Sequence, residues 1–395
     1  MTPVQMIHRT PTRDFKDGHP FGAQTAQKAL HFHESIPGYA ATPLVELKTL
    51  ANALGVSSIY VKDESKRFGL NAFKALGASF CIAGLLVQRF SLPRIDYSLL
   101  QAPELRDEIR DITFVTATDG NHGRGVAWTA NRLGSKCVVY MPKGSAAERL
   151  ENIRALGANA SITDMNYDDT VRFASTQAEQ HGWILVQDTA WEGYSDVPTR
   201  IMQGYTTIGS ELTSQLGNTR PTHVFLQAGV GSMAGAMADY FMDLYRDAPP
   251  IITVVEPHNA DCIFRTAAAD DGRLRCVGGD LHTIMAGLAC GEPCSIAWDM
   301  LKRAATFFVS MPDYVAANGM RILGNPMGSD PRVISGESGA SAFGFAAEVL
   351  RNPELVHLRE QLCLDASSRL LCISTEGDTD RENYRRIVWD GAYNG

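Results

Sequence analysis

The chain has 395 residues, of which 45% are hydrophobic and 20% charged, and its formal net charge is -8. This length allows two domains with separate cores, and the composition is ordinary for a globular enzyme. The acidic balance excludes an electrostatic surface for nucleic acid or anionic membranes. No apolar run reaches membrane-spanning length, and the N-terminus has no signal-like apolar core. We therefore expect a cytoplasmic enzyme.

The first 45 or so residues are polar and irregular, and beyond them strand-like and helix-like runs alternate. Strands are predicted at 58–62, 112–117, 136–141, 159–163, 183–187, 222–227, 251–255 and 370–374. Helices are predicted at 75–90, 123–133, 146–156, 167–180, 199–216, 232–245 and 340–350. Ser145 and Glu148 have the spacing of a capping box for the third of these helices.

The alternation of apolar, β-branched strands with helices predicts an α/β protein with mainly parallel sheets covered by helices on both faces. Two such sheets fit the length, so we predict two three-layer αβα domains. Ligand sites favour the carboxyl ends of parallel strands and the cleft between domains. We therefore expect the active site in that cleft.

The cysteines and histidines do not predict a metal site. The chain has eight cysteines and ten histidines, and Cys290 and Cys294 are four residues apart without a paired Cys-x-x-Cys or His cluster. Structural zinc sites need such a second pair of ligands. Most of the cysteines lie in apolar runs and are expected to be buried hydrophobic side chains.

Lys74 is the first candidate for chemistry. It lies in the segment 63–79, between the strand at 58–62 and an apolar helix, and is flanked by Phe73 and Leu76. Burial disfavours the ammonium form and lowers a lysine pKa, which suits nucleophilic or Schiff-base chemistry. The alternative is a lysine that extends from the first helical turn to water.

A glycine-rich loop follows the strand at 222–227. It reads Gln-Ala-Gly-Val-Gly-Ser-Met-Ala-Gly from Gln227 to Gly235 and leads into a helix. Such a loop lets the free N–H groups of a helix N-terminus approach a phosphate. The spacing is not that of a dinucleotide fingerprint, although Glu256 ends the next strand where a ribose-binding acid would lie. The glycines could also serve helix packing alone.

Three further loops carry polar residues at the ends of predicted strands. The first runs from Thr116 to Gly125 and reads Thr-Ala-Thr-Asp-Gly-Asn-His-Gly-Arg-Gly; its backbone N–H groups suit a carboxylate or a ring oxygen. The others run from Val186 to Tyr194, with Asp188, and from Cys372 to Asp380, with Ser374 and Thr375. Asp378 and Asp380 are expected in a solvated turn.

Together these motifs resemble the fold type II pyridoxal-phosphate enzymes, the group of tryptophan synthase β and threonine dehydratase. Within that group the chain looks most like the diaminopropionate ammonia-lyases. The closer resemblance is carried by six stretches, at 62–74, 118–125, 187–194, 284–293, 334–339 and 373–380. They extend over most of the chain, so the resemblance is specific.

The resemblance implies a residue set for pyridoxal phosphate. Lys74 would form the covalent bond to the cofactor, and Asn121 would lie near its ring hydroxyl. Ser374 or Thr375 would contact the pyridine nitrogen. The phosphate would be held by the glycine loop, through Gly229, Val230, Gly231, Ser232 and Met233.

The same resemblance implies α,β-elimination of D- and L-2,3-diaminopropionate to pyruvate and ammonia. The substrate would be bound by Thr118, Asp119, Gly120, His122 and Asp188. Asp119 is the strongest sequence argument for this substrate, because an extra carboxylate favours a β-ammonium over the hydroxyl of serine or threonine. The two enantiomers present their Cα protons to opposite faces of the cofactor, so we predict Lys74 as the base for the L form and Asp119 for the D form. Asp188 would position the amino group or assist proton transfer.

The resemblance also implies a homodimer and a division of the chain. The large cofactor-binding domain would comprise residues 1–88 and 200–395, and the small domain residues 89–199. Cys262 and Cys290 fall where chains of this family also carry cysteine; a disulfide between them would be unusual in a reducing compartment.

Three alternatives remain at this stage. A threonine or serine dehydratase would share the cofactor and fold but have a different leaving group. A nicotinamide-dependent oxidoreductase would use the glycine loop and Glu256, but it leaves Lys74 and Asn121 unexplained. A regulatory amino-acid-binding protein would not need Lys74.

Overall fold

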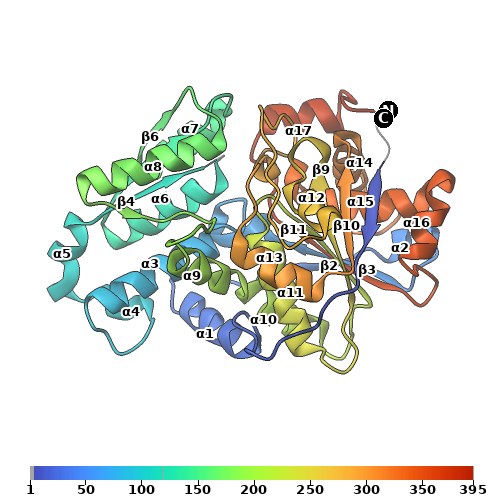
Figure 1. Ribbon diagram of the computed structural model, residues 1–395, viewed down its shortest axis with the longest axis horizontal. Helices are drawn as coiled ribbons and strands as arrows, with labels where there is room; N and C mark the ends of the chain where they lie inside the picture. The colour runs from blue at the N-terminus through green and yellow to red at the C-terminus, as the bar shows by residue number, and fades with distance from the viewer. Residues whose placement is uncertain (1–3, 119, 395) are drawn as a thin grey trace.

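The computed structural model describes residues 4–118 and 120–394, and it contains two β-sheets (Figure 1). The larger sheet has seven strands, in the spatial order β1 (Gln5–His8), β10 (Phe307–Met311), β9 (Ile251–Pro257), β8 (His223–Gln227), β11 (Arg369–Ser374), β3 (Ser58–Asp63) and β2 (Leu44–Glu46). The smaller has four, in the order β6 (Asn159–Ile162), β5 (Lys136–Met141), β4 (Thr113–Ala117) and β7 (Ile184–Leu185). Only the edge strands β1 and β2 pair antiparallel.

The larger sheet is covered on both faces, and the alternation of its side chains explains why. On β8, Val224 and Leu226 belong to one hydrophobic cluster, whereas Phe225 between them belongs to another. The first cluster includes Met237 of a helix on one face, and the second includes Phe343 of a helix on the other. Since successive strand residues point to opposite faces, the sheet is the middle layer of three.

The smaller sheet has the same three-layer construction. Phe114 of β4 packs in a cluster with Val126 of one helix, and its neighbour Val115 packs in a different cluster with Val171 of another helix. The predicted α/β class with two mainly parallel, helix-covered sheets is therefore confirmed.

The helices fall into two sets. Those between residues 97 and 181 are α4 (Tyr97–Leu100), α5 (Arg106–Asp111), α6 (Asn121–Leu133), α7 (Ala147–Arg154) and α8 (Tyr167–His181). The others are α1 (Ala23–Glu34), α2 (Lys48–Leu54), α3 (Ala75–Arg89), α9 (Asp196–Tyr205), α10 (Thr207–Leu216), α11 (Ser232–Leu244), α12 (Cys262–Ala269), α13 (Ser295–Ala304), α14 (Asp313–Gly324), α15 (Glu337–Arg351), α16 (Val356–Gln361) and α17 (Arg381–Val388). Helix α3 packs on both α6 and α9, so it joins the two parts.

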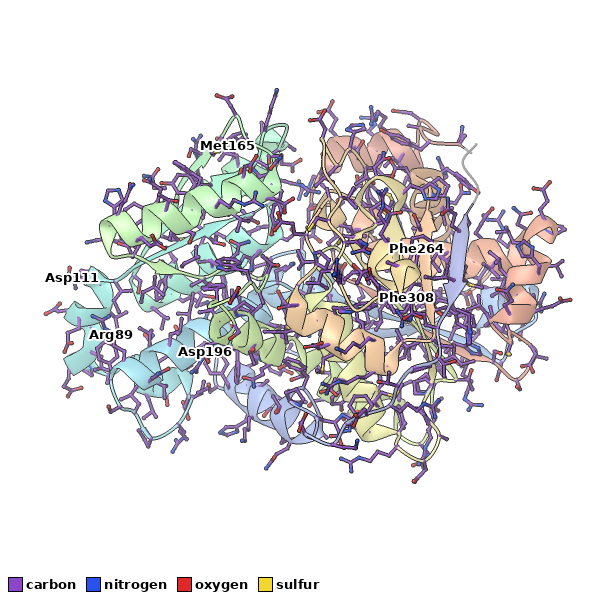
Figure 2. The ribbon with its side chains drawn as sticks, viewed as in Figure 1. Arg89, Asp111, Met165, Asp196, Phe264 and Phe308 are labelled. Atoms are coloured by element: carbon purple, nitrogen blue, oxygen red, sulfur yellow. The ribbon has the colours of Figure 1, made fainter. Side chains whose placement is uncertain are left out.

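The side chains in Figure 2 follow this division. Phe308 on β10 and Phe264 on α12 are buried in the part built on the larger sheet. Asp111 at the end of α5 lies at the opposite side of the molecule, as does Arg89 at the end of α3, the helix that joins the two parts (Figure 2). Among the described residues, no helix combines the length and apolar character that a membrane span requires.

Four sequence-based expectations about local structure are wrong. The first 46 residues contain β1, α1 and β2. The helix α1 was missed because it buries only four of its twelve residues. The helix expected at 199–216 is two helices, since at Thr206 the backbone N–H bonds to the carbonyl of Gln203, three residues back. The strand expected at 183–187 pairs only at Ile184 and Leu185. Ser145 does not cap α7, because its hydroxyl donates to the carbonyl of Pro142 at 2.8 Å.

Candidate active site

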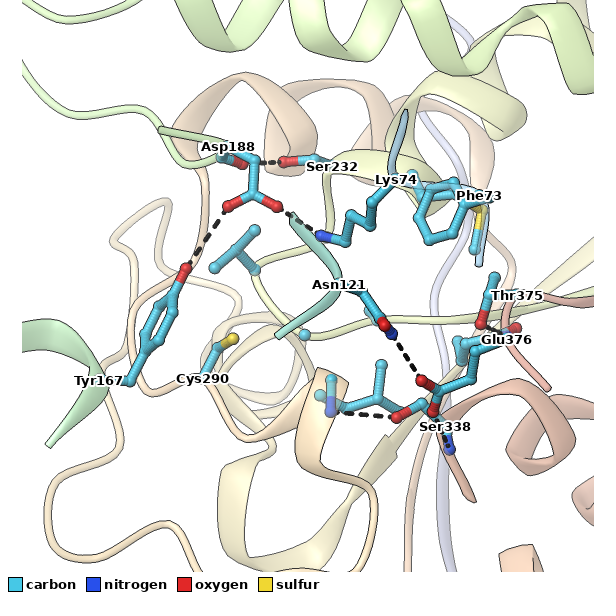
Figure 3. A pocket seen from close by; sticks show the side chains of 18 residues that line it. Phe73, Lys74, Asn121, Tyr167, Asp188, Ser232, Cys290, Ser338, Thr375 and Glu376 are labelled. Atoms are coloured by element: carbon cyan, nitrogen blue, oxygen red, sulfur yellow. Dashed lines mark hydrogen bonds and ion pairs between the residues drawn. The ribbon is translucent and has the colours of Figure 1, made fainter. Parts of the chain in front are cut away.

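A cavity lies between the two sheets, where the carboxyl ends of their strands face each other. Its walls come from segments that follow β3, β4, β6, β7, β8 and β11, together with the segment before α13 and the start of α15 (Figure 3). The lining residues are Phe73, Lys74, Asn121, Tyr167, Asp188, Gln227, Ala228, Gly229, Val230, Gly231, Ser232, Met233, Gly287, Leu288, Cys290, Ser338, Thr375 and Glu376. The cleft expected from the sequence is therefore present.

Lys74 lies on one wall of this cavity, immediately before α3. The preceding residue, Phe73, donates its backbone N–H to the carbonyl of Thr375 at 3.1 Å, which fixes this segment beside the continuation of β11. The Lys74 side chain is 18% exposed and forms an ion pair with Asp188. Its Nζ lies 5.6 Å from the ring centre of Phe73 and 6.0 Å from that of Tyr205. The predicted partly buried setting of Lys74 is confirmed, and the alternative of a solvated lysine is wrong.

Asp188 is the buried carboxylate that faces Lys74. Tyr167 donates its hydroxyl to Asp188 Oδ1 at 3.4 Å, and Ser232 donates to the backbone carbonyl of Asp188 at 2.7 Å. Burial raises the pKa of Asp188, whereas His122 and Lys74 lower it, and the result is a pKa of about 2. Asp188 is therefore ionised throughout the physiological pH range.

His122 lies behind Asp188 and does not line the cavity. Its Nε2 lies 2.7 Å from the carbonyl oxygen of Val186, so Nε2 carries the hydrogen and donates it. Its Nδ1 lies 3.8 Å from Asp188 Oδ2 and has no hydrogen-bond partner among the described residues. Burial lowers the pKa of His122, an effect that the neighbouring Asp188 opposes.

The glycine loop brings the N-terminus of α11 to the cavity. A Cβ on Gly229 would lie 3.1 Å from the Sγ of Cys290, and Gly231 has a φ of +95°, so neither position readily accepts another residue. Gly235 serves a different purpose, because a Cβ there would lie 2.9 Å from the Cα of Ala297 on α13. The first two glycines thus shape the loop, and the third allows α11 to pack on α13.

The loop after β4 contributes Asn121, the first residue of α6. Its Nδ2 donates to Glu376 Oε2 at 2.6 Å, across the cavity (Figure 3). Thr118 is turned away from the cavity and caps the start of α6, since its Oγ1 accepts the N–H groups of Gly120 at 2.9 Å and Gly123 at 3.0 Å. Neither Thr118 nor Gly120 lines the cavity. Asp119 lies outside the described residues.

The end of β11 separates the two hydroxyl candidates. Ser374 donates to the Oγ of Ser335 at 2.7 Å and does not line the cavity. Thr375 does line it, and its Oγ1 accepts a hydrogen bond from Gln227 Nε2 at 2.9 Å. That bond leaves the hydroxyl hydrogen of Thr375 available to an acceptor in the cavity.

Glu256 does not belong to a dinucleotide site. Its buried carboxylate accepts the backbone N–H groups of Ile263 at 2.9 Å and Phe264 at 2.5 Å, and so caps α12. Burial raises the pKa of Glu256 well above its ordinary value. A carboxylate engaged in this way has no role in binding a ribose, so the basis for the oxidoreductase alternative is lost.

Cys262 and Cys290 are both buried, and within the described part of the chain neither forms a disulfide. The Sγ of Cys262 lies 3.8 Å from the carbonyl oxygen of Gly229, and Cys290 lines the cavity. Both cysteines therefore border the glycine loop.

Nine lining residues had no site role assigned from the sequence: Phe73, Tyr167, Gln227, Ala228, Gly287, Leu288, Cys290, Ser338 and Glu376. Six of them lie inside stretches that carry the family resemblance, so a signal was present without an assigned role. Tyr167 lies outside those stretches. The available signal was its place at the first turn of α8, just after the carboxyl end of β6.

The cavity fits pyridoxal phosphate. It offers a primary amine on Lys74 for the aldehyde and the N-terminus of α11, behind a glycine loop, for the phosphate. It also contains a buried acceptor, Gln227 Oε1, that has no partner among the described residues. An apolar wall formed by Phe73, Val230 and Leu288 suits an aromatic ring.

Comparison with known proteins agrees with this geometry. A family model described as pyridoxal-phosphate dependent enzyme matches residues 36–356. The diaminopropionate ammonia-lyase of Escherichia coli strain K12 is 53% identical over 376 residues, which are 94% of this chain and 93% of that protein. That of Salmonella typhimurium strain LT2 is 51% identical over 370 residues, 92% of each chain.

A solved structure extends the match to three dimensions. The crystal structure of the E. coli enzyme in complex with an aminoacrylate–PLP azomethine reaction intermediate has a TM-score of 0.91 with this structure at 49% identity, covering 99% of this chain and 98% of that one. On this evidence the chain belongs to the pyridoxal-phosphate-dependent enzymes and, among them, to the diaminopropionate ammonia-lyase family.

Proposed function

We propose that this chain catalyses the α,β-elimination of D- and L-2,3-diaminopropionate to pyruvate and ammonia, with pyridoxal phosphate as its cofactor. The observation that carries the proposal is the pairing of Lys74 with the buried carboxylate of Asp188 beside the glycine loop of α11. The overall reaction removes a proton from Cα and ammonia from Cβ. Hydrolysis of the remaining three-carbon product then releases pyruvate and the second ammonia.

The cofactor would be held by residues on three sides of the cavity. We assign the phosphate to the backbone N–H groups of Gly229, Val230, Gly231, Ser232 and Met233, because a helix N-terminus attracts an anion. We assign the ring oxygen to Asn121 and the pyridine nitrogen to Thr375, whose hydroxyl hydrogen is available. When bound, the cofactor supplies an electron sink for the charge that develops at Cα.

The chain's own residues would manage the protons. The amine of Lys74, when it is free, lies near enough to Asp188 for the two groups to receive and hold the proton from Cα of the substrate. Asp188 would also keep the substrate's β-amine protonated, which makes it a better leaving group. Its low pKa supports this role, because the carboxylate stays charged as it faces an ammonium. Tyr167 fixes Asp188 from the opposite side.

The D enantiomer requires a second base. We assign it to Asp119. Its neighbours Thr118, Gly120 and His122 do not line the cavity, so any contribution of theirs to substrate binding would be indirect. Among these neighbours, His122 lies behind Asp188, with its Nδ1 3.8 Å from Asp188 Oδ2.

The coarser features of the enzyme complete the proposal. We propose a large domain of residues 1–88 and 200–395 and a small domain of residues 89–199. This division is supported by the four strands of the smaller sheet, which all lie between residues 113 and 185. We further propose that the enzyme is a cytoplasmic homodimer.

Product analysis with four substrates tests this function. Purified holoenzyme is incubated with D- and L-diaminopropionate, L-threonine and L-serine, and the keto acid and ammonia are measured. We expect pyruvate and two ammonia per molecule from both enantiomers of diaminopropionate, at rates far above those with the hydroxy amino acids. Preferential turnover of threonine or serine would move the function to a dehydratase.

Two matched variants test whether the two enantiomers use separate bases. Asp119→Asn should abolish turnover of the D form and leave part of the turnover of the L form, whereas Asp188→Asn should reduce both by about a hundredfold. Equal loss of both enantiomers in Asp119→Asn would contradict the assignment of separate bases.

A further inference from the structure

Glu376 is a buried carboxylate that lines the cavity and that the proposed mechanism does not use. It follows Thr375 at the end of β11 and is only 1% exposed. The sequence patterns assigned it no role, although it lies in the segment from Cys372 to Asp380. Its position opposite Asn121, which Figure 3 shows, calls for a physical explanation.

Three donors fix this carboxylate. The backbone N–H of Ser338, in the first turn of α15, donates to Oε1 at 3.2 Å. The hydroxyl of Thr379 donates to Oε2 at 3.1 Å, and the amide Nδ2 of Asn121 donates to the same oxygen at 2.6 Å. A helix N-terminus favours a negative charge, and a carboxylate can only accept hydrogen bonds.

This restriction determines how Asn121 presents its amide. An asparagine side chain in a cavity has two orientations that exchange its oxygen and nitrogen. A carboxylate at 2.6 Å allows only the orientation with the NH₂ group toward Glu376, so the carbonyl oxygen must lie on the other side. An uncharged partner that can both donate and accept would permit either orientation.

We propose that Glu376 is a positioning residue that locks the Asn121 amide in one orientation toward the cofactor ring. The bond also joins the start of α6, after the smaller sheet, to the end of β11 in the larger sheet, so it ties together the two sides of the cavity. The inference rests on the proposed function, because it takes the cavity as the cofactor site.

The test is a double-mutant cycle read through cofactor retention. Holoenzyme is prepared as wild type, Glu376→Gln, Asn121→Ala and the double variant. Alkaline phosphatase destroys released pyridoxal phosphate, and the loss of the visible absorption band gives the release rate. We expect release to be about tenfold faster in Glu376→Gln, as for a lost hydrogen bond to a charged group. In the Asn121→Ala background, Glu376→Gln should not increase the release rate further, because the amide that Glu376 positions is absent.

The neighbouring Glu337→Gln is the matched control. Glu337 is equally buried, but it accepts from Asn383 and does not line the cavity. We expect its release rate to equal that of wild type. Should Glu376→Gln fail to fold, Thr379→Val removes only one donor to the carboxylate. It should accelerate release two- to threefold, and only when Asn121 is present.

The outcomes separate the inference from the function on which it rests. A wild-type protein that retains no pyridoxal phosphate would overturn the proposed function. A wild-type protein that retains it, with multiplicative effects of Glu376→Gln and Asn121→Ala or no effect of Glu376→Gln, would overturn the positioning role alone. A shifted absorption band in Glu376→Gln that disappears in the double variant would support it.

Discussion

Two lysines twelve residues apart, Lys62 and Lys74, both pair with a buried carboxylate, yet their surroundings are opposite. Lys62 is fully buried at the end of β3, and its three donors are all used: by the carbonyl of Thr42 at 2.7 Å, Glu211 Oε2 at 2.6 Å and Gln215 Oε1 at 2.8 Å. Lys74 is partly exposed to a cavity, with aromatic rings beside it and Asp188 as its carboxylate partner.

The carboxylates differ in the same way. Glu211 lies between two cations, Lys62 and Arg67, and accepts hydrogen bonds from both. Burial raises the pKa of Glu211, but Arg67 and Lys62 outweigh this effect and lower it to about 2. With Glu64, which pairs with Arg67, the four charges sum to zero inside the protein. This network binds the segment before Lys74 to α10, whereas the Lys74–Asp188 pair faces a space that a ligand can enter. A lysine with every donor satisfied is structural, and one that faces a cavity is available for chemistry.

The largest effect is expected from Lys74→Ala. Turnover of both enantiomers of diaminopropionate should fall by about a thousandfold or more, since the change removes the nucleophile and a general base together. The exposed Lys66 lies in the same segment, and Lys66→Ala should leave the rate unchanged. Steady-state assays of pyruvate formation compare the two. Comparable activity in Lys74→Ala and wild type would remove Lys74 from the mechanism.

Lys62→Met should act on stability instead. It removes one of the two cations that pair with Glu211 and leaves the buried network with a net negative charge. Breaking a buried ion pair in this way typically costs about 3–5 kcal/mol of unfolding free energy. The matched change is Lys48→Met on the surface, where the lysine is 74% exposed and pairs with Glu46; it should cost less than about 0.5 kcal/mol. Urea unfolding measures both. A Lys62→Met protein as stable as wild type would contradict the structural role of the network.

Glu337 provides a third kind of buried acidic group, one that lies near a second carboxylate, Glu376. Burial raises its pKa to about 7, with Glu376 adding to the shift and Arg149 opposing it. The folded protein therefore holds this proton more tightly than the unfolded chain between pH about 4.5 and about 7, so stability falls as the pH rises through that window. The full effect is about 3 kcal/mol.

Glu337→Gln isolates that effect. The variant keeps the shape of the side chain but cannot ionise, so its stability relative to wild type should increase between pH 5 and pH 8. Urea unfolding at intervals of one pH unit measures the difference. A constant difference across this range would show that the proton on Glu337 is not linked to folding.

The smallest effects are expected at the end of β11. Thr375→Val removes a hydroxyl that lines the cavity and should lower the rate about tenfold and shift the visible absorption band. Ser374→Ala removes a hydroxyl directed at Ser335 and should leave the band where it is. A spectral shift in Ser374→Ala with none in Thr375→Val would reverse the assignment.

Sequence patterns predicted the α/β architecture because its strands are short apolar runs separated by amphipathic helices. They failed where tertiary contacts decide local structure. The edge strand β1 has no alternating pattern of its own and exists through pairing with β10. Likewise, Thr206 interrupts a segment whose apolar periodicity continues on both sides.

The site shows the same limit. Lys74 and the glycine loop were found because their residue types are unusual at a junction between a strand and a helix. Glu376 was missed because an acidic residue in a turn is ordinary in sequence, and only the fold brings it within 2.6 Å of Asn121. The choice between Ser374 and Thr375 likewise depends on which side of a strand end faces the cavity.

The central claim is that Lys74, and not its structural counterpart Lys62, is the lysine that holds the cofactor. Reduction of the holoenzyme with borohydride fixes the pyridoxyl group to its lysine, and peptide mapping by mass spectrometry then locates it. We predict a single modified peptide with the group on Lys74 and an unmodified Lys62. A pyridoxyl group on any other lysine, or on none after incubation with pyridoxal phosphate, would contradict the account.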